Sequence, residues 1–153
     1  MIYYFAYGRN MNPRVMAERC GREMDTIKRY GAKLPGFALK FQKKALDGDF
    51  SYADVVICDD DEVEGTVYEL MESDMKIVDS YEGFPEHYKR DLLPALDENG
   101  RKLMVAVFQA QPEHVVEGLK PKREYIQDLI RGEFLSPSYK KFLESIPTFE
   151  EPS

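Results

Sequence analysis

The apolar residues of this chain fall mostly in short runs, and the first run opens the sequence. Residues 2–7 are aromatic, aliphatic or small and carry no charge, a pattern typical of a buried β-strand. Gly8 ends the run. Asn12 followed by Pro13 predicts a helix start, because Asn caps helices well and Pro fits the first helical position. Gly21 is expected to end that helix in a left-handed conformation.

The residues between this strand and this helix, Tyr7, Gly8, Arg9 and Asn10, predict a tight turn. Such a turn directs several backbone N–H groups at one place, and the following helix adds the positive end of its dipole. The turn can therefore hold a carboxylate or an oxyanion. It can equally be an ordinary connection between a strand and a helix, and the residues alone leave both interpretations open.

Alternating or continuous apolar patterns predict further strands at residues 37–42, 53–58, 63–70, 88–95 and 103–110. Residues 35–36 and 97–100 have the composition of turns. The four consecutive acids at 59–62 favour a solvated hairpin tip over a cation site. Gly65, inside a strand pattern, is expected to leave room beside something bulky.

Three more helices are predicted. One begins with Ser73 as N-cap and ends at Gly83, which puts Glu82 in its last turn. Two others, at residues 121–131 and 137–145, each begin with a proline at a plausible first helical position.

Many short strands with interspersed helices predict an α+β fold with a mainly antiparallel or mixed sheet that can close into a barrel. At 153 residues the chain suits one core, so we expect a single domain over residues 1–146 and a frayed polar tail over 147–153.

The net charge of −7 disfavours nucleic-acid binding, and no apolar run approaches the roughly 20 residues that cross a membrane. The N-terminus lacks the features of a signal peptide, so a cytoplasmic location is expected. Cys20 and Cys58 are expected to be reduced and half-buried. With two histidines and no ligand-type spacing, no metal site is expected.

Glu82 is a candidate general acid and base. The negative end of a helix dipole disfavours an ionised carboxylate, and Tyr81 and Phe84 would desolvate it, so both effects raise its pKa. A carboxyl group with a pKa near neutrality can accept and return a proton at pH 7. Glu82 can also be a plain surface residue, and Glu86 is an equal rival on these grounds. His87 is expected to lie exposed in a polar loop.

Tyrosines are the other candidates for a site. Tyr7, Tyr88, Tyr125 and Tyr139 can line a pocket or fill the core, and the pattern does not separate these roles.

Several segments in order resemble one protein family. Residues 4–11, YFAYGRNM, resemble the YFAYGSNM opening of the γ-glutamylcyclotransferase-like family, which includes γ-glutamylamine cyclotransferases and AIG2-like proteins. The order and spacing of the other segments agree over about residues 2–145. These segments are similar to the family's LxGYxLxF, VxGxLYxL, xLDxYEGxxxxYxR and PSxxYxxxIxxG patterns at residues 34–41, 63–70, 75–90 and 121–132.

This resemblance implies a mixed β-barrel with flanking helices and a reaction that needs no metal or cofactor. In such enzymes the α-amine of a γ-glutamyl group attacks its own γ-carbonyl, which releases 5-oxoproline and an amine or amino acid. Glu82 falls on the family's catalytic glutamate, and the turn from Tyr7 to Asn10 would hold the substrate's carboxylate and ring oxygen. Tyr88 and Tyr125 also stay on the pattern. The expected partner is a small γ-glutamyl substrate, with the protein a monomer or a homodimer.

Arg9 departs from the family pattern, which has Ser at this position. If the turn binds through backbone N–H groups, Arg9 can add a charge-assisted contact to a carboxylate. If the small Ser is needed for space, Arg9 restricts the substrate. Two other functions stay open: a catalytically silent module that binds a small carboxylate, and a protein-interaction domain with an exposed apolar patch.

Overall fold

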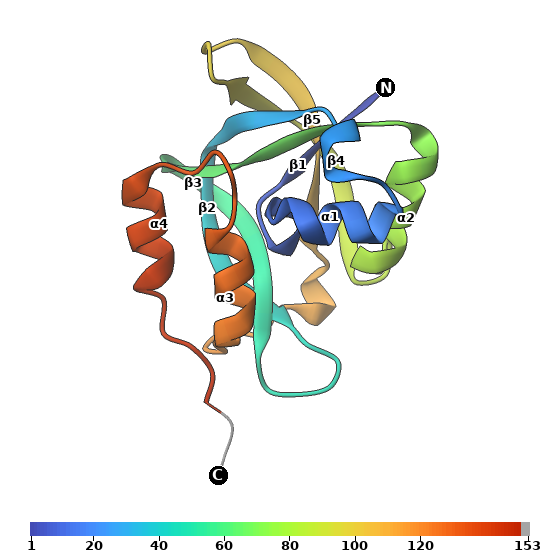
Figure 1. The fold of residues 1–153 in the computed structure, drawn as a ribbon. Helices are drawn as coiled ribbons and strands as arrows, with labels where there is room; N and C mark the ends of the chain where they lie inside the picture. Colours follow the sequence, from blue (N-terminus) through green and yellow to red (C-terminus); the bar gives the residue numbers. More distant parts are fainter. Residues whose placement is uncertain (151–153) are drawn as a thin grey trace.

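The computed structural model describes residues 1–150 and shows a closed β-barrel with helices packed on it (Figure 1). Around the barrel the strands follow the order β1-β3-β2-β4-β5. β1 runs parallel to β5, with Tyr4 opposite Ala106, and the other neighbouring pairs are antiparallel. The expected mixed, mainly antiparallel barrel is confirmed. Its strands are β1 (Ile2–Ala6), β2 (Arg29–Lys44), β3 (Ser51–Leu70), β4 (Tyr88–Asp97) and β5 (Lys102–Ala110).

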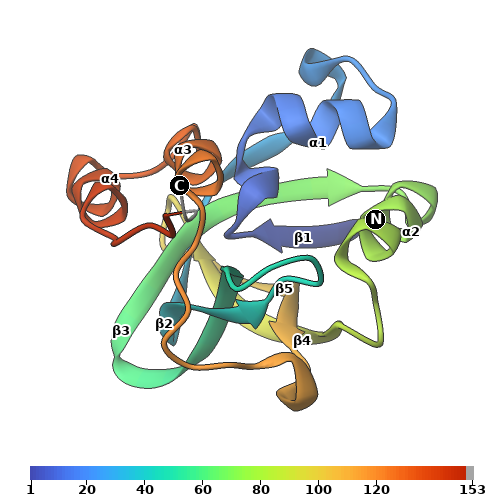
Figure 2. The same ribbon diagram turned by 90° about the horizontal axis from the view of Figure 1, so that it is seen from below.

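The helices lie outside the barrel. Figure 2 shows α1, α3 and α4 along one side of it, and α2 beside the start of β1. Short 3₁₀ turns connect some of the elements, and the first of them, Arg9–Met11, lies between β1 and α1. The α-helices of residues 1–150 are α1 (Pro13–Cys20), α2 (Glu72–Glu82), α3 (Arg123–Ile130) and α4 (Pro137–Glu144).

Two hydrophobic clusters follow from the alternation of side chains along the strands. On β1, Phe5 belongs to the cluster that fills the barrel with Leu34 and Val67. Its neighbour Tyr4 belongs to the cluster that also contains residues of the helices, among them Met16. From Tyr4 to Ala6 the first strand is therefore buried on both faces, which explains the apolar run in this part of it.

The predicted helix ends of α1 are confirmed. The Asn12 side chain accepts a hydrogen bond from the Arg14 N–H at 3.1 Å, Pro13 is the first helical residue, and Gly21 ends the helix with a φ of 63°. Gly83 ends α2 in the same left-handed conformation. Ser73 is not the N-cap of α2, because the helix already begins at Glu72.

Two predicted turns are wrong because strands β2 and β3 are longer than their apolar patterns. Residues 35–36 and the acids at 59–62 lie within continuous strands. The pairing passes from Pro35 opposite Glu62 to Phe37 opposite Ile57, so β3 has extra residues there. This bulge accommodates the turn-type residues and the exposed acids. The same residue types also favour a chain reversal, so their local pattern predicted turns.

The last third of the chain is attached more firmly than expected. Pro121 lies before α3, which begins at Arg123. The Phe149 N–H donates to the Pro121 carbonyl at 2.7 Å, and the Phe149 ring lies 5.7 Å from that of Phe50. The expected tail is therefore docked as far as Phe149, and residues 151–153 of it lie outside the described residues.

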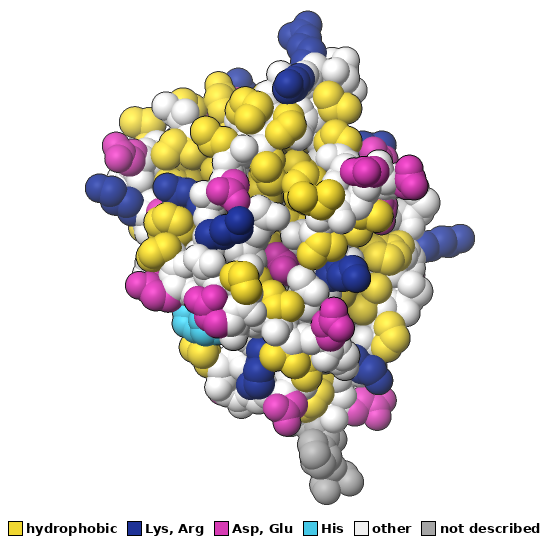
Figure 3. Space-filling view, turned by 180° about the vertical axis from the view of Figure 1, so that it is seen from behind, with side chains coloured by type: hydrophobic (Ala, Val, Ile, Leu, Met, Phe, Trp, Pro, Cys, Tyr) yellow, Lys and Arg dark blue, Asp and Glu magenta, His cyan; other side chains and the backbone are white. Residues whose placement is uncertain are grey.

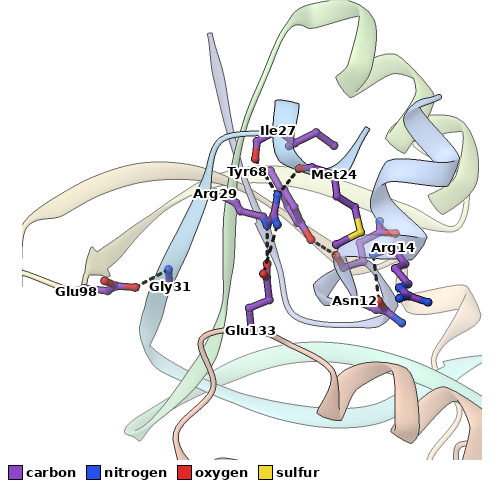
Figure 4. A network of polar contacts seen from close by, with 10 residues as sticks. Asn12, Arg14, Met24, Ile27, Arg29, Gly31, Tyr68, Glu98 and Glu133 are labelled. Atoms are coloured by element: carbon purple, nitrogen blue, oxygen red, sulfur yellow. Dashed lines mark hydrogen bonds and ion pairs between the residues drawn. The ribbon is translucent and has the colours of Figure 1, made fainter. Parts of the chain in front are cut away.

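One arginine ties the beginning of β2 to the segment between α3 and α4 (Figure 4). The Arg29 guanidinium pairs with both carboxylate oxygens of Glu133, at 2.5 and 3.3 Å, and also donates to the backbone carbonyls of Met24 and Ile27. Four acceptors on one guanidinium fix the position of this strand relative to the helices.

The surface seen from behind in Figure 3 carries acidic and basic side chains interspersed with hydrophobic ones, and they do not gather by sign. No helix within residues 1–150 has the length and hydrophobicity to span a bilayer. Both cysteines are free. Neither is half-buried as expected, because Cys20 is buried and Cys58 is exposed.

Gly65 provides a test of the barrel packing. A Cβ at this position would overlap the Ala6 carbonyl oxygen and lie 2.7 Å from the Phe5 ring, which confirms the expected close approach. Gly65→Ala should lower the free energy of unfolding by roughly 2 kcal/mol, because a packed interior cannot yield without strain. Urea unfolding measures this change. Lys33→Ala, at an exposed position of β2, is the control and should cost less than about 0.5 kcal/mol; equal effects of the two substitutions would contradict the prediction.

Candidate active site

A cavity of about 630 Å³ opens at one end of the barrel, where the end of β1, the end of α2 and the start of α3 converge. The predicted substrate-binding residues and the predicted catalytic residue all line it. These residues are Tyr7, Gly8, Arg9, Asn10, Glu82, Tyr88 and Tyr125. The structure thus brings together side chains separated by more than one hundred positions of sequence, although it does not by itself assign their roles.

The turn after β1 presents unused backbone donors to this cavity. The N–H groups of Gly8, Arg9 and Asn10 have no hydrogen-bond acceptor among residues 1–150, because they open the 3₁₀ turn. From the other side, the Tyr68 hydroxyl donates to the Asn10 carbonyl at 2.6 Å and fixes the turn (Figure 4 shows this tyrosine). Fixed, unpaired N–H groups suit a carboxylate or an oxyanion.

Asn10 connects this turn to Glu82. Its side chain is buried, and its amide nitrogen donates to the Tyr4 hydroxyl at 3.0 Å and to Glu82 Oε1 at 3.4 Å. Its amide oxygen accepts from Arg19 Nη1 at 2.9 Å. The orientation of the amide is set by these three partners, so the carboxylate and the turn are held in one rigid arrangement.

Glu82 is the last residue of α2, as predicted, because Gly83 ends the helix. Burial raises the pKa of its carboxyl group to about 7, while the positive charges of Arg19 and Lys43 oppose the increase and Asp79 adds to it. The expected shielding by Tyr81 does not hold, because that side chain is 57% exposed. A carboxyl group with this pKa is able to take up and release protons at neutral pH.

The end of α2 is anchored to the barrel by an ion pair. Arg90 on β4 donates to both carboxylate oxygens of Asp79, at 2.5 and 2.6 Å, and its guanidinium lies over the Phe84 ring. Because Asp79 lies one turn before Glu82, this pair helps to fix the position of the candidate base.

Arg9 does not extend into the cavity to fill it. Its Nε donates to Asp128 Oδ2 on α3 at 2.9 Å, and Asn12 donates to the other oxygen of the same carboxylate at the same distance. The side chain of Arg9 is 52% exposed at the rim. The guanidinium therefore attaches the turn to α3, and the backbone of the turn stays accessible.

Three of the tyrosines that line the cavity differ in how they use their hydroxyl groups. Tyr7 donates its hydroxyl proton to the Phe108 carbonyl at 2.6 Å, and Tyr88 donates to the Ala53 carbonyl at 2.8 Å. The Tyr125 hydroxyl instead accepts from the Ala53 N–H at 3.0 Å. Tyr125 consequently keeps a hydroxyl proton for a ligand, whereas the other two use theirs to hold the barrel end together.

Gly8 leaves room for the Tyr125 hydroxyl group. Its φ of −114° does not demand glycine, but a Cβ there would lie 2.8 Å from the Tyr125 hydroxyl oxygen. The absence of a side chain lets α3 approach the turn, so the cavity can be narrow at this point.

Sequence reasoning missed the cavity residues Tyr4, Arg19 and Lys43. Arg19 lies on α1, bonds to Asn10 and covers the Tyr81 ring at 4.5 Å, and Lys43 lies at the end of β2. A buried lysine was not foreseeable from its polar neighbours. For Arg19, the only signal in the sequence was its position about two helical turns after Asn12, the N-cap of α1.

The rival carboxylate, Glu86, is exposed and does not line the cavity. His87 does line it and is only partly exposed, contrary to expectation. In the described part of the chain, no group of three His, Cys, Asp or Glu side chains is arranged to hold a metal ion.

The chain is similar to known proteins over most of its length. A family model described as "Gamma-glutamyl cyclotransferase, AIG2-like" matches residues 4–127. No curated protein matches the chain.

Solved structures share the fold. A γ-glutamyl cyclotransferase is similar with a TM-score of 0.84 and 20% identity, covering 99% of this chain and 91% of its own. An uncharacterized protein from Homo sapiens gives a TM-score of 0.85 at 20% identity with the same coverage. YkqA from Bacillus subtilis gives 0.81 at 24% identity, covering 97% of this chain and 56% of its own. At these identities the likeness concerns the fold.

The raised pKa of Glu82 predicts a measurable effect on stability. Below pH 4.5, its ordinary pKa, the group is protonated in both folded and unfolded chains and has no effect. As the pH rises toward 7 the unfolded chain ionises first, so the folded state loses stability, by roughly 2–3 kcal/mol above pH 7. Glu82→Gln removes this cost. Chemical unfolding should show the variant to be more stable than the parent at pH 8 and equal to it at pH 4.

Glu86→Gln is the matched control, because it removes an exposed carboxylate four positions away and should have little effect at either pH. If the Glu82→Gln variant were less stable than the parent at pH 8, the prediction would be wrong, because the folded protein would then stabilise the ionised carboxylate.

Proposed function

Because the chain belongs to the γ-glutamyl cyclotransferase, AIG2-like family, we propose that it converts a γ-glutamyl amide to 5-oxoproline and a free amine or amino acid. The observation that carries this proposal is the pairing, in one cavity, of a carboxyl group with a pKa of about 7 and a turn with unpaired N–H groups. The carboxyl group accepts and returns protons, and the N–H groups bind the negative charge.

Glu82 is the proton carrier in this proposal. It takes a proton from the α-ammonium of the γ-glutamyl group, and the resulting amine attacks the γ-carbonyl carbon. The new C–N bond closes a five-membered ring. The bond to the leaving nitrogen then breaks as Glu82 returns the proton to that nitrogen. The ring nitrogen carries two protons after the attack and releases one of them, which the departing amine takes up to leave as an ammonium ion. The cycle restores the carboxylate and consumes no other reactant.

The turn from Tyr7 to Asn10 holds the γ-glutamyl group. Its N–H groups receive the α-carboxylate and the oxygen that becomes negative in the transition state, where one such donor contributes about 3 kcal/mol. Tyr125 has a hydroxyl proton available to the same group, and Tyr88 forms part of the wall. Arg9 supports the turn through Asp128.

Little more is needed for such a reaction. The nucleophile and the electrophile belong to one molecule, so the protein has to fold the substrate and move protons. Correct orientation supplies up to roughly 7–11 kcal/mol in the best intramolecular reactions. The cytoplasmic location and the monomeric or homodimeric state expected from the sequence stay predictions.

The activity is tested by incubating the protein with a γ-glutamyl dipeptide and with γ-glutamyl-lysine and measuring 5-oxoproline. Glu82→Gln should lower kcat by about 10²–10⁴, because the amide cannot carry the proton. Glu86→Gln, with its exposed position, is the control and should keep the parent rate.

Absence of product from a panel of such substrates at high protein concentration would reject the enzyme. Bound but unconverted substrate would favour the catalytically silent binding module. A loss of less than tenfold in Glu82→Gln would instead keep the reaction and remove Glu82 from its role.

The pH dependence follows from the pKa of Glu82. The base form is ionised, so kcat/KM should fall about tenfold per pH unit below pH 7 and level off above it. Steady-state rates between pH 5 and 9 measure this limb. A profile that stays flat down to pH 5 would mean that a group with an ordinary carboxylate pKa is the base.

A further inference from the structure

Lys43 is a buried cation in the wall of the active-site cavity. Its residue is only 4% exposed, and it lies near the end of β2, paired with Tyr52 of β3. Within residues 1–150 no carboxylate lies within ion-pair distance of its ammonium group. Burying a charge without a carboxylate in contact is costly: burial lowers the pKa of Lys43, and the charge of Glu82 opposes this only in part, so an anion bound beside the ammonium group would stabilise it.

The contacts that Lys43 does make leave donors unused. Its Nζ lies 3.2 Å from His87 Nδ1 and 5.8 Å from the centre of the Tyr88 ring. An ammonium group has three N–H donors, and the imidazole takes one of them. The other two are free to bind an anion in the cavity.

His87 is suited to orient this ammonium group. Burial, together with the charge of Lys43 and the neighbouring His114, lowers the pKa of His87. A neutral imidazole that accepts at Nδ1 carries its proton on Nε2. The His114 ring, whose centre is 4.2 Å away, holds the imidazole in place.

The other two cations at the cavity each bond to a polar side chain. Arg9 pairs with the Asp128 carboxylate, and Arg19 donates to the Asn10 amide oxygen while covering the Tyr81 ring. Lys43 differs from both because its residue is buried and its hydrogen-bond partner is the His87 imidazole.

The cavity consequently contains two places that favour an anion, and they come from different elements. One is the turn after β1, with its unpaired N–H groups, and the other is the Lys43 ammonium at the end of β2. A γ-glutamyl amine has one carboxylate. A γ-glutamyl amino acid has two, one on the γ-glutamyl group and one beside the amide that breaks.

Resting on the function proposed above, we propose that Lys43, oriented by His87, binds the carboxylate of the leaving group, and that the protein therefore prefers γ-glutamyl amino acids to γ-glutamyl amines. A cationic leaving group would meet the like charges of Lys43 and Arg19. Its available partner would be Asp47, which is exposed at the rim, where an ion pair contributes little.

Two substrates that differ in one charge test this proposal. γ-Glutamyl-alanine and γ-glutamyl-alaninamide have the same scissile bond, but only the first has a carboxylate on the leaving group. The parent protein should turn over the first with a kcat/KM about 10- to 100-fold higher, the range expected of a charge-assisted hydrogen bond. A third substrate, γ-glutamyl-lysine linked through the lysine side-chain nitrogen, extends the comparison. Its leaving group has a carboxylate that lies far from the amide bond that breaks.

Lys43→Met keeps the apolar stem and removes the charge. It should lower the ratio of the two kcat/KM values at least tenfold, mainly through KM for γ-glutamyl-alanine. Lys40→Met, on the exposed side of the same strand, is the matched control and should leave the ratio unchanged. Thermal unfolding verifies that both variants fold.

The comparison of substrates in the parent protein needs no variant, so the proposal can be rejected even if Lys43→Met does not fold. Equal kcat/KM for the two substrates would overturn it while leaving the proposed reaction intact. An equal loss for both substrates in Lys43→Met would also overturn it and give Lys43 a structural role. Failure to convert any γ-glutamyl compound would instead reject the reaction itself.

Discussion

The closure of the barrel by β1 is the constraint on which the rest of this structure depends. This strand pairs with β3 on one side and with β5 on the other. Its two faces belong to the two hydrophobic clusters, so its register is fixed in every direction. The turn at Gly8 to Asn10 leaves this strand directly. Its N–H groups consequently occupy a fixed place at the end of the barrel, where α2 and α3 deliver Glu82 and Tyr125.

The electrostatics of the cavity oppose the stability of the folded state, and in the proposed reaction they assist catalysis. A carboxylate whose pKa rises to about 7 and an ammonium without a counter-ion are both unfavourable in the folded state. They partly compensate each other. Burial raises the pKa of Glu82 and lowers the pKa of Lys43, and the charge of each group opposes the shift of the other. In the proposed reaction the substrate brings a carboxylate to Lys43 and a proton to Glu82, and so supplies the charges that both groups lack.

The sequence predicted those features that depend on neighbours along the chain. The start of α1 at Asn12 and Pro13 and the end of α2 after Glu82 follow from local backbone chemistry. Local signals misled at residues 35–36 and 59–62, because a bulge between two long strands uses the same residue types as a turn. Lys43 could not be predicted as buried, since its burial depends on Tyr88 and His87, which come from distant segments. The family resemblance identified Glu82 as a candidate. The raised pKa of its carboxyl group depends on burial by residues that come together only in the folded chain.

The bond between the Tyr7 hydroxyl and the Phe108 carbonyl joins positions 101 residues apart. It belongs to the seam between the first and last strands of the barrel, so this seam forms only after nearly all of the barrel sequence is available. Contacts of such long sequence separation slow folding, because the chain has to be ordered before they form. During synthesis the first strand leaves the ribosome early and waits for its partner β5. Pairing with β3 can cover one edge of β1 earlier, so the edge toward β5 is the one that stays unpaired until the last strand is available.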